Sequence, residues 1–427
     1  MQICIAFYIH LFYVSRMYNY ITRTLEPYLI KAASEFPAVL VTGPRQSGKT
    51  TILGHTFAKT HKFVSLDEPD LRMLALSDPR FFIQRYSPPV VFDEIQYVPE
   101  LLHYIKRDID EHRQQKARYL LSGSQNLALM QGLSETLAGR AAVLSLLSLS
   151  NRERSGSANQ SPFWQRDKNS VKLDQIPTEF YSGSAIMKNI LRSSFPELAV
   201  EPQRDARAWF AAYVQTYLER DVRNIRNVGS LNDFQRFLQL LATRVAQQIN
   251  VSDLSRDIGV AVNTIKAWLS VLEATFQIVL VRPYFVNMGK RLVKSPKLYF
   301  VDPGLAAHLS GLQDPEHALM GPMGGPLFEN AVFAEIYRSF LHRGEQARVY
   351  FWRTAAGHEV DFILDFGTEI IPVEVKLNAT PTPELAKNLH DFIALFKNRV
   401  GQAILVCLTN NETQLSEKIT AIPFALL

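Results

Sequence analysis

Residues 43–50 read GPRQSGKT and fit the pattern G-x-x-x-x-G-K-[ST] in full. The two glycines, Gly43 and Gly48, allow backbone amides to turn toward phosphate oxygens. Lys49 can then reach the outer phosphates of a nucleotide, and the Thr50 hydroxyl can contact magnesium. The pattern predicts a site for ATP and Mg²⁺ formed by Gly43, Pro44, Arg45, Gln46, Ser47, Gly48, Lys49, Thr50 and Thr51.

Two carboxylates follow a second apolar run, PPVVFDEIQ at residues 88–96. This run predicts a buried strand that delivers Asp93 to the carboxyl edge of a sheet, where magnesium would lie beside the phosphates. Glu94 is then placed to polarise the attacking water. The alternative is an acidic pair that only ends a strand, and the apolar lead-in favours the catalytic interpretation.

Two further segments supply candidates for the same site. RYLLSGSQN, residues 118–126, predicts a strand ending in polar groups that can touch the γ-phosphate and the water; Ser124 is the first candidate and Gln125 the second. Arg140 in the segment LAGR is a candidate charge-sensing or finger arginine, on its own nucleotide or on that of a neighbouring subunit. A solvated arginine at a helix end is the alternative.

The C-terminal part contains a second group of charged residues. Because side chains alternate along a strand, Glu374 and Lys376 in IPVEVK share a face, and HEVDFIL places Asp361 on the preceding strand. The arrangement resembles the PD-(D/E)xK nuclease core, in which two carboxylates bind magnesium and the lysine orients or activates water. An upstream helical glutamate usually completes such a site, so Glu329 is the first candidate and Glu335 the second.

An inactive, retained fold is the alternative for this group, with the lysine and the carboxylates forming an ion-paired strand face. Three charges on one face of an apolar sheet are costly to bury without a metal or partners, so a site stays an open interpretation beside the inactive fold.

A winged helix-turn-helix is predicted downstream of residue 250. Ser252 can cap a short helix, Gly259 ends it, and Asn263 can cap a second helix that runs to about Ala274. The β-rich runs FQIVLVRPY and KLYFVD follow. Cations suited to phosphate contacts are Arg256, Lys266, Arg282, Lys290, Arg291, Lys294 and Lys297.

The second of these helices, VNTIKAWLSVLE, carries a single cation, which argues against sequence-specific reading of bases. A lid or a packing module between domains is the alternative interpretation.

Apolar strand-like runs alternate with helix-like stretches from Tyr18 to about Ser150, which predicts a parallel sheet with crossover helices. The expected strands are 38–42, 62–66, 89–93 and 118–124. The polar segment that follows looks like an exposed insertion, and a flexible GPMGGP at 321–326 precedes a helix that starts at Leu327.

The expected fold class is α/β: a P-loop NTPase parallel sheet, then a helical and winged-helix domain, then a PD-(D/E)xK-like α/β domain. The expected boundaries are a non-native or disordered leader at 1–17, an ATPase domain at 18–150, a polar insertion or linker at 151–178, a helical and winged-helix domain at 179–320 and a nuclease-like domain at 321–427. Met17 is the expected true start, and a short membrane-associating segment is the alternative for the leader.

Composition restricts these expectations only weakly. A formal charge of +5 over 427 residues permits a nucleic acid or an acidic membrane surface without arguing for either. Two cysteines near opposite ends, Cys4 and Cys407, support neither a disulfide framework nor a zinc site, so a reducing cytoplasm is expected.

The order of these motifs resembles the AAA-type ATPases of bacteria and archaea that carry a C-terminal domain of unknown function with a restriction-endonuclease-like pattern. The resemblance extends from about Met17 to Leu427 and includes YLERDVRNI, GKRLVKSPKLYFVDPGLAAHL, LFENAVFAEI, HEVDFIL and IPVEVK. The leader and the stretch from Arg152 to about Asp174 depart from it. The resemblance implies ATP binding and hydrolysis but no physiological substrate.

The leading hypothesis is a cytoplasmic Mg²⁺-dependent ATPase coupled to DNA through its winged-helix and nuclease-like domains. The alternative is an ATP-driven signalling or protein-interaction switch with an inactive nuclease-like domain. ATPase action on DNA without cutting is the third. DNA and a second copy of the chain are candidate partners, and no membrane partner is expected.

Overall fold

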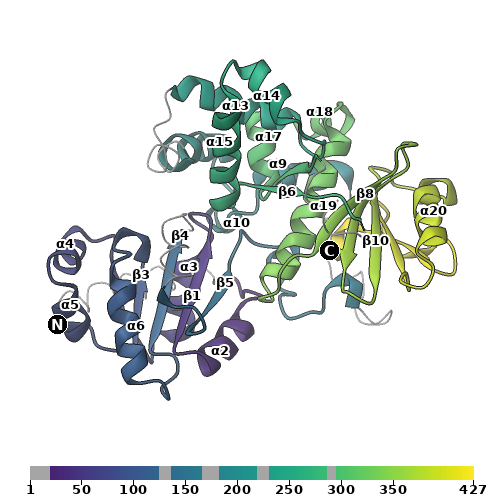
Figure 1. The fold of residues 1–427 in the computed structure, drawn as a ribbon. Coiled ribbons are helices and arrows are strands. Elements are labelled where there is room, and N and C mark those ends of the chain that lie inside the picture. The colour runs from purple at the N-terminus through teal and green to yellow at the C-terminus, as the bar shows by residue number, and fades with distance from the viewer. Residues whose placement is uncertain (1–19, 125–135, 166–181, 219–229, 286–294) are drawn as a thin grey trace.

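A computed structural model describes residues 20–124, 136–165, 182–218, 230–285 and 295–427. A parallel sheet, a helical region and a second sheet follow one another along the chain, and they form three lobes (Figure 1). The leader expected at 1–17 lies outside the described residues.

The first lobe is a five-stranded parallel sheet with the strand order β2-β3-β4-β1-β5. The four strands that the apolar runs predict are confirmed, whereas β5 was missed. Only one of the five side chains in this strand, AAVLS, is fully buried, so its pattern differs little from that of a loop. The strands are β1 (Ala38–Gly43), β2 (Lys62–Ser65), β3 (Val90–Asp93), β4 (Tyr119–Ser124) and β5 (Ala141–Ser145).

Helices cover both faces of this sheet, which explains why its inner strands are almost continuously apolar. Val39 and Val41 point to one face and pack in the same core as Leu29 of α2. Leu40 points to the other face, where Ile105 of α6 joins its core. The helices of this lobe are α2 (Glu26–Glu35), α3 (Lys49–Phe57), α4 (Pro69–Ser77), α5 (Pro79–Arg85) and α6 (Leu101–Glu111), with the 3₁₀ turn η1 (Ile95–Tyr97).

The helical lobe includes two short helices followed by a two-stranded antiparallel sheet. Gly259 ends α14 in the left-handed region (φ 84°), as predicted. The predicted caps are wrong: Asn250 caps α14 by accepting from the Ser252 amide, and α15 begins at Val262 without a side-chain cap. The elements are α9 (Gly183–Arg192), α10 (Pro196–Val200), α11 (Ala206–Tyr213), η5 (Val214–Leu218), α13 (Leu231–Thr243), α14 (Val251–Ile258), α15 (Val262–Ala274), β6 (Ile278–Val281), β7 (Lys297–Phe300), α17 (Pro303–Leu309) and α18 (Pro315–Met320).

The third lobe is a six-stranded mixed sheet with the order β12-β13-β11-β10-β9-β8. The helix expected from Leu327 begins instead at Gly324, so GPMGGP is partly helical; a proline in the first turn costs no hydrogen bond, because the amide there has no partner within the helix. The elements are α19 (Gly324–Leu341), β8 (Val349–Arg353), β9 (Glu359–Asp365), β10 (Ile370–Val375), η6 (Pro383–Ala386), α20 (Lys387–Leu395), β11 (Ala403–Cys407), β12 (Thr413–Gln414), β13 (Ile419–Pro423) and η7 (Phe424–Leu426).

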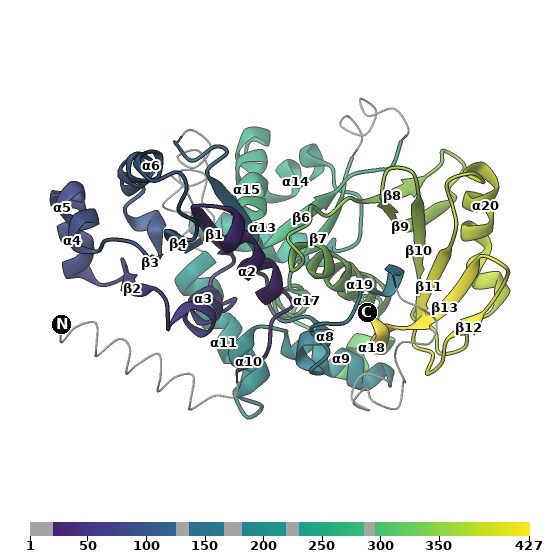
Figure 2. The same cartoon turned by 90° about the horizontal axis from the view of Figure 1, so that it is seen from below.

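The described part of the segment after the parallel sheet, residues 151–165, is not the exposed linker that its polar composition indicates, and the remainder of the predicted insertion, 166–178, lies outside the described residues. Residues Asn151–Arg154 form the short helix α8, whose first three side chains are buried, and Phe163 and Trp164 of η2 (Phe163–Gln165) are buried as well. Arg152 donates from Nε to the carbonyl of Leu427 at 2.6 Å, and Figure 2 shows α8 near the C-terminal end. Buried partners satisfy these charges, so polar composition misled the prediction.

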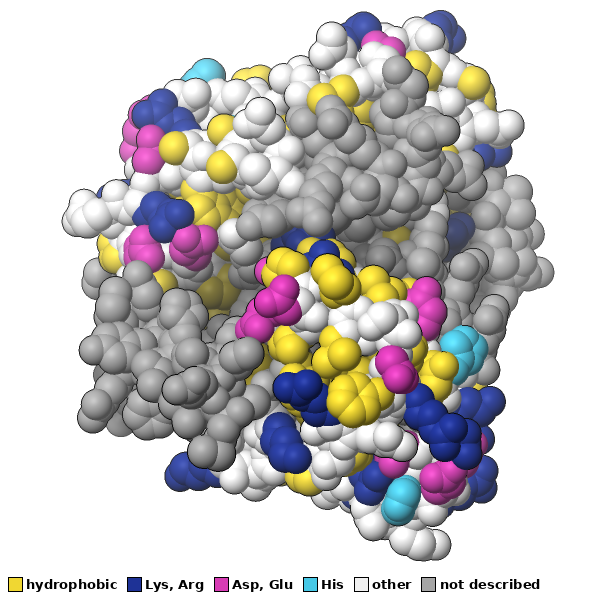
Figure 3. All heavy atoms as spheres, turned by 90° about the vertical axis from the view of Figure 1, so that its left-hand side faces the viewer, with side chains coloured by type: hydrophobic (Ala, Val, Ile, Leu, Met, Phe, Trp, Pro, Cys, Tyr) yellow, Lys and Arg dark blue, Asp and Glu magenta, His cyan; other side chains and the backbone are white. Residues whose placement is uncertain are grey.

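Exposed apolar side chains gather on the outer face of the first lobe, over α4 and α5, where Met73, Leu76 and Phe81 are exposed. Acidic and basic side chains are interspersed on that face (Figure 3). Among the helices in the described part of the chain, none has the length and apolar character needed to cross a membrane.

Candidate functional site

The loop between β1 and α3 has a backbone that only glycine accepts at two positions. Gly43 has φ 152°, and a Cβ there would lie 2.0 Å from the carbonyl oxygen of Leu146. Gly48 has φ 93° and precedes the first residue of α3. The loop therefore turns tightly at the carboxyl edge of the sheet, and the amino end of α3 faces the space above it.

Lys49 and Thr50 begin α3 and face this loop and the neighbouring strand. The buried Lys49 ammonium donates to the carbonyls of Pro44 at 2.8 Å and Gly43 at 3.3 Å. Thr50 Oγ1 donates to Asp93 Oδ1 at 2.9 Å. The structure thus brings Lys49, Thr50 and Asp93 together from segments far apart in the sequence.

Asp93 is buried at the end of β3. Burial raises its pKa to about 6, with a further contribution from the Glu94 carboxylate, while hydrogen bonds from Ser122 and Thr50 act in the opposite direction. A cation beside this carboxylate would favour its charged form. Magnesium therefore fits this donor set of a buried carboxylate and an adjacent hydroxyl.

Sequence reasoning missed Ser122, whose hydroxyl donates to Asp93. The predicted Ser124 ends β4 two residues later and lies beside Gly43 in the strand register. Phe92 pairs with Leu121, so Asp93 comes next to Ser122. That register is not visible in the sequence. Gln125 lies outside the described residues.

Glu94 lines the same pocket as Lys49 and Thr50. Its backbone is left-handed (φ 58°), its amide donates to Ser122 Oγ at 3.3 Å, and its carboxylate accepts from Gln96. The amide of Gln96 thus holds the carboxylate that was predicted to polarise water.

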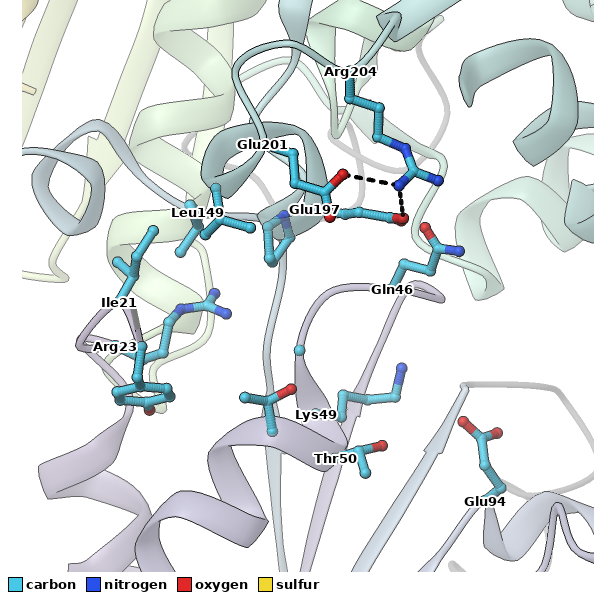
Figure 4. A pocket seen from close by; sticks show the side chains of 15 residues that line it. Ile21, Arg23, Gln46, Lys49, Thr50, Glu94, Leu149, Glu197, Glu201 and Arg204 are labelled. Carbon is cyan, nitrogen blue, oxygen red and sulfur yellow. Dashed lines mark hydrogen bonds and ion pairs between the residues drawn. The ribbon is translucent and has the colours of Figure 1, made fainter. Parts of the chain in front are cut away.

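The pocket has a volume of about 510 Å³, within the range of small-molecule sites. Figure 4 shows Lys49, Thr50 and Glu94 on one side and Glu197, Glu201 and Arg204 on the opposite rim. The lining comprises Tyr20, Ile21, Arg23, Gln46, Gly48, Lys49, Thr50, Thr51, Glu94, Leu149, Pro196, Glu197, Val200, Glu201 and Arg204. One part of this wall is polar and the other apolar, as a nucleotide with charged phosphates and a flat base requires.

The segment around α10 contributes an arginine that the sequence did not reveal. Arg204 Nη1 lies 2.7 Å from Glu197 Oε1 and 3.0 Å from Glu201 Oε2. Arg204, on the rim opposite Lys49, is a better candidate than Arg140 for an arginine that contacts the nucleotide. No local sequence motif distinguishes it.

Arg140 lies at the wrong edge of the sheet to reach this pocket. It precedes β5, its carbonyl accepts from the amide of Ala38, and its Nε lies 2.8 Å from Asp110 Oδ1. Ala38 and Gly43 stand at opposite ends of β1, roughly 16 Å apart at the rise of a strand. Arg140 therefore does not reach a nucleotide bound in this pocket of its own chain, and action on the nucleotide of a neighbouring subunit stays a prediction.

The C-terminal charged residues come together in a cluster in which Asp361 and Glu374 are buried and Lys376 is partly exposed. Asp361 accepts from the amide of Val375 at 2.8 Å, and Lys376 Nζ lies 2.6 Å from Glu374 Oε1. Glu329, the first of the two upstream candidates, accepts from Tyr299 at 2.5 Å. Burial, followed by the Asp361 charge, raises the pKa of Glu329 to about 7 and that of Glu374 to about 8.

The prediction that Lys297 lies on an exposed wing is wrong. Lys297 belongs to this cluster. Its ammonium forms an ion pair with Glu359 and lies 3.1 Å from Glu329 Oε1 and 3.7 Å from Asp361 Oδ1, and its side chain is only 4% exposed. Burial lowers the pKa of Lys297, but the three carboxylates outweigh this effect and raise it. A surface phosphate contact by Lys297 is excluded.

The second upstream candidate, Glu335, has a different role. It pairs with Arg338 at 2.7 Å and accepts from the Asn151 amide at 3.0 Å, so it holds α8 against α19. Of the predicted wing cations, Lys290, Arg291 and Lys294 lie outside the described residues. Within the described ranges, no group of three or more His, Cys, Asp or Glu residues has a metal-holding arrangement.

Protein-family models match three parts of the chain. Residues 35–155 match an AAA domain, residues 184–316 match a domain of unknown function (DUF8612), and residues 324–427 match another (DUF4143). Over 396 residues the chain is 27% identical to an uncharacterized protein of Mycobacterium tuberculosis, covering 92% of this chain and 82% of that protein. An uncharacterized protein of Mycobacterium bovis matches to the same extent.

Two solved structures are similar in part. A Walker-type ATPase of Pyrococcus abyssi aligns with 15% identity and a TM-score of 0.46, covering 68% of this chain and 96% of that chain. RuvB of Thermotoga maritima aligns with 16% identity and a TM-score of 0.28, covering 60% and 88%. At these TM-scores neither likeness carries an argument about function.

P-loop nucleotide-binding proteins are the class that the parallel sheet and its glycine-rich turn define. The match to an AAA domain over residues 35–155 includes both the glycine-rich turn and the strand end carrying Asp93, so this part of the chain is similar to AAA domains.

Proposed function

We propose that the protein is a Mg²⁺-dependent ATPase whose hydrolytic site is the pocket between the parallel sheet and α10. The hydrogen bond of 2.9 Å between Thr50 and Asp93 carries this proposal. It links the start of α3 to the neighbouring strand end, where a hydroxyl and a carboxylate can share one metal ion.

Each residue then has one task. The loop amides and Lys49 hold the phosphates, and Lys49 exchanges its bonds to the carbonyls of Gly43 and Pro44 for phosphate oxygens. Thr50 and Asp93 hold the magnesium ion, which when bound neutralises charge that develops on the phosphates. Glu94 orients the attacking water and accepts its proton. Ser124 at the neighbouring strand end touches the γ-phosphate.

The test replaces Lys49 by Ala and measures ATP affinity and turnover in the purified protein. Removing the only lysine ammonium of the described pocket should lower kcat/KM at least about a hundredfold, the effect of losing a buried charged contact. Lys62→Ala, an exposed lysine at the start of β2, is the matched control and should act like the wild type. Undiminished hydrolysis in Lys49→Ala rejects the proposal.

For the rest of the molecule, we favour the second function: a nucleotide-driven switch whose nuclease-like domain does not cut DNA. The buried Lys297 supports it, because a resident ammonium between Glu329, Glu359 and Asp361 supplies the charge that a catalytic metal would otherwise bring. The PD-(D/E)xK interpretation then describes a retained fold.

Coupling to DNA through a winged helix is the rival proposal. Among the described residues of the helical lobe, Arg236, Arg244 and Arg256 each form an ion pair with a nearby aspartate, which weakens a basic binding face. A magnesium- and manganese-dependent cleavage assay on duplex, branched and single-stranded DNA separates the two. Cleavage that Asp361→Ala abolishes supports a nuclease; DNA-stimulated ATP turnover without nicking supports ATPase action on DNA.

A further inference from the structure

Arg23 joins the nucleotide pocket to a buried polar network that nothing in the phosphate-binding motif predicts. Its Nη1 donates to the carbonyl of Ser47 at 2.8 Å, and its Nη2 donates to the carbonyl of Leu147 at 2.7 Å. The side chain is only 4% exposed and lines the pocket, and Figure 4 shows it on the same side as Ile21.

The contact with Ser47 acts on the phosphate loop itself. Ser47 lies directly before Gly48, and a Cβ on Gly48 would come within 3.3 Å of Arg23 Nη1, so the guanidinium packs against the bend. A guanidinium group holds its N–H donors in one rigid plane. Its hydrogen bonds to the carbonyls of Ser47 and Leu147 therefore fix the distance between the phosphate loop and the segment after β5.

Glu153 of α8 holds the third side of this guanidinium. Its Oε1 lies 3.2 Å from Arg23 Nε, and backbone amides of Thr24 and Ser150 donate to its two oxygens at 2.8 and 2.9 Å. Burial by itself raises the pKa of Glu153, but the charge of Arg23 and the contact with His342 outweigh burial and hold that pKa below its usual value. The carboxylate is therefore charged and fully partnered.

The network continues into the third lobe through His342, which caps the end of α19. Its Nε2 accepts from the amide of Leu147 at 3.1 Å, so its proton lies on Nδ1, which is 3.1 Å from Glu153 Oε1. One histidine thus contacts two of the three residues that bind the Arg23 guanidinium.

We propose that Arg23 is a positioning residue of the nucleotide site, and that Glu153 and His342 make its position depend on the docking of α19. This inference rests on the proposed ATPase function. Binding at the phosphate loop and docking of α19 are then coupled, and coupling is reciprocal: whatever loosens α19 weakens nucleotide binding, and nucleotide strengthens the docking.

The first test is Arg23→Lys, which keeps the charge but cannot reach two carbonyls and Glu153 together. The dissociation constants of ADP and ATP, measured by calorimetry on the full chain, should rise about tenfold, as for the loss of one charged hydrogen bond. The control is Arg118→Lys, a buried arginine paired with Asp108 before β4, at the other edge of the same sheet. It should lower stability but change nucleotide affinity less than twofold.

The second test leaves Arg23 intact, so its outcome does not depend on whether the Arg23→Lys variant folds. His342→Gln keeps an acceptor for Leu147 and loses the N–H group that lies near Glu153, whereas His342→Asn keeps that N–H group and loses the acceptor. The Gln variant should weaken ADP binding about threefold to fivefold, a fraction of one hydrogen bond, and the Asn variant less than twofold. Circular dichroism checks that each variant is folded at the assay temperature.

Equal affinities for Arg23→Lys and Arg118→Lys would overturn the positioning role, while wild-type affinity in both His342 variants would overturn the link to α19. Either result leaves the ATPase proposal standing, provided that wild type binds nucleotide and Lys49→Ala does not. Failure of wild type to bind nucleotide instead rejects the function on which the inference rests.

Discussion

Two regions of the molecule contain buried acidic side chains, and they differ in what neutralises those acids. At the edge of the parallel sheet, Asp93 accepts from the hydroxyls of Thr50 and Ser122, and Thr50 also lines the open pocket. In the third lobe, Asp361 and Glu329 meet the ammonium of Lys297. The first region leaves a place for an added cation, and in the second the protein's own lysine occupies that place.

The difference shows that carboxylates at the right spacing do not by themselves define a metal site. A buried carboxylate needs a countercharge, and a metal ion and a lysine both supply it. Which one applies depends on a residue outside the motif: Lys297 comes from β7, a strand of the preceding lobe.

Asp93→Asn should have the largest effect. Without the carboxylate, magnesium-dependent turnover should fall by about three orders of magnitude, the scale of losing a principal electrostatic contact of the transition state. The nucleotide-free variant should nevertheless be more stable at pH 8, with a free energy of unfolding higher by up to about 3 kcal/mol. The reason is that a pKa raised to about 6 marks an unfavourable buried charge. Urea titrations and phosphate-release assays measure both quantities.

Asp110→Asn, which changes an exposed aspartate on α6, controls for removal of an acidic side chain and should affect turnover less than twofold. Lower stability of Asp93→Asn in the absence of nucleotide would contradict the charge argument.

Lys297→Met should destabilise the chain by about 3–5 kcal/mol at pH 8, since it leaves buried carboxylates without a countercharge. The loss should shrink as the pH falls, because Glu329 and Glu374, with raised pKa values of about 7 and 8, take up protons more readily in the folded chain than in the unfolded chain. Denaturant unfolding at pH 6 and pH 8 measures this.

Manganese titration of the same variant tests whether a divalent ion can replace the Lys297 ammonium. If the divalent ion restores stability to Lys297→Met but leaves wild type unchanged, the lysine and a metal compete for one place. Lys266→Met, an exposed lysine of α15, is the control, and wild-type stability in Lys297→Met would contradict the interpretation.

Acid should weaken magnesium binding at the first region. The raised pKa of Asp93 means that this carboxyl keeps its proton in the nucleotide-free state up to about pH 6. Below that pH, the magnesium concentration for half-maximal turnover should rise about tenfold per pH unit, because one proton competes with the metal. A constant magnesium requirement from pH 7 to pH 5 would contradict the assignment of Asp93.

Arg140→Ala should have the smallest effect. Its ion pair with Asp110 is screened by solvent, so the free energy of unfolding should hardly change. Turnover at nanomolar protein should stay within twofold of wild type, because the arginine lies at the far edge of the sheet. A loss that appears only at high protein concentration would indicate action on a second copy of the chain.

Local signals predicted much of the first lobe. The glycine-rich turn, the apolar strands and the residues Lys49, Thr50, Asp93 and Glu94 could be identified because the motif and its flanking elements are continuous in sequence. Strand β5 was not predicted because only part of it is buried. Ser122 was not predicted because the register depends on how two strands pair.

Long-range charge pairing explains the remaining errors. Lys297 carried the signature of an exposed basic wing, and residues 151–154 that of a solvated linker; both are buried because their partners are distant in sequence. A polar residue indicates exposure only when no partner is at hand, and partners far along the chain cannot be read from one sequence.

The two walls of the nucleotide pocket come from opposite sides of a junction, the parallel sheet on one and the segment around Pro196 and Arg204 on the other. A ligand that contacts both walls stabilises the junction between them, because its binding free energy adds to that of the contacts between the walls. Melting of the helical lobe should accordingly shift upward with the logarithm of nucleotide concentration, even though most of that lobe never meets the ligand.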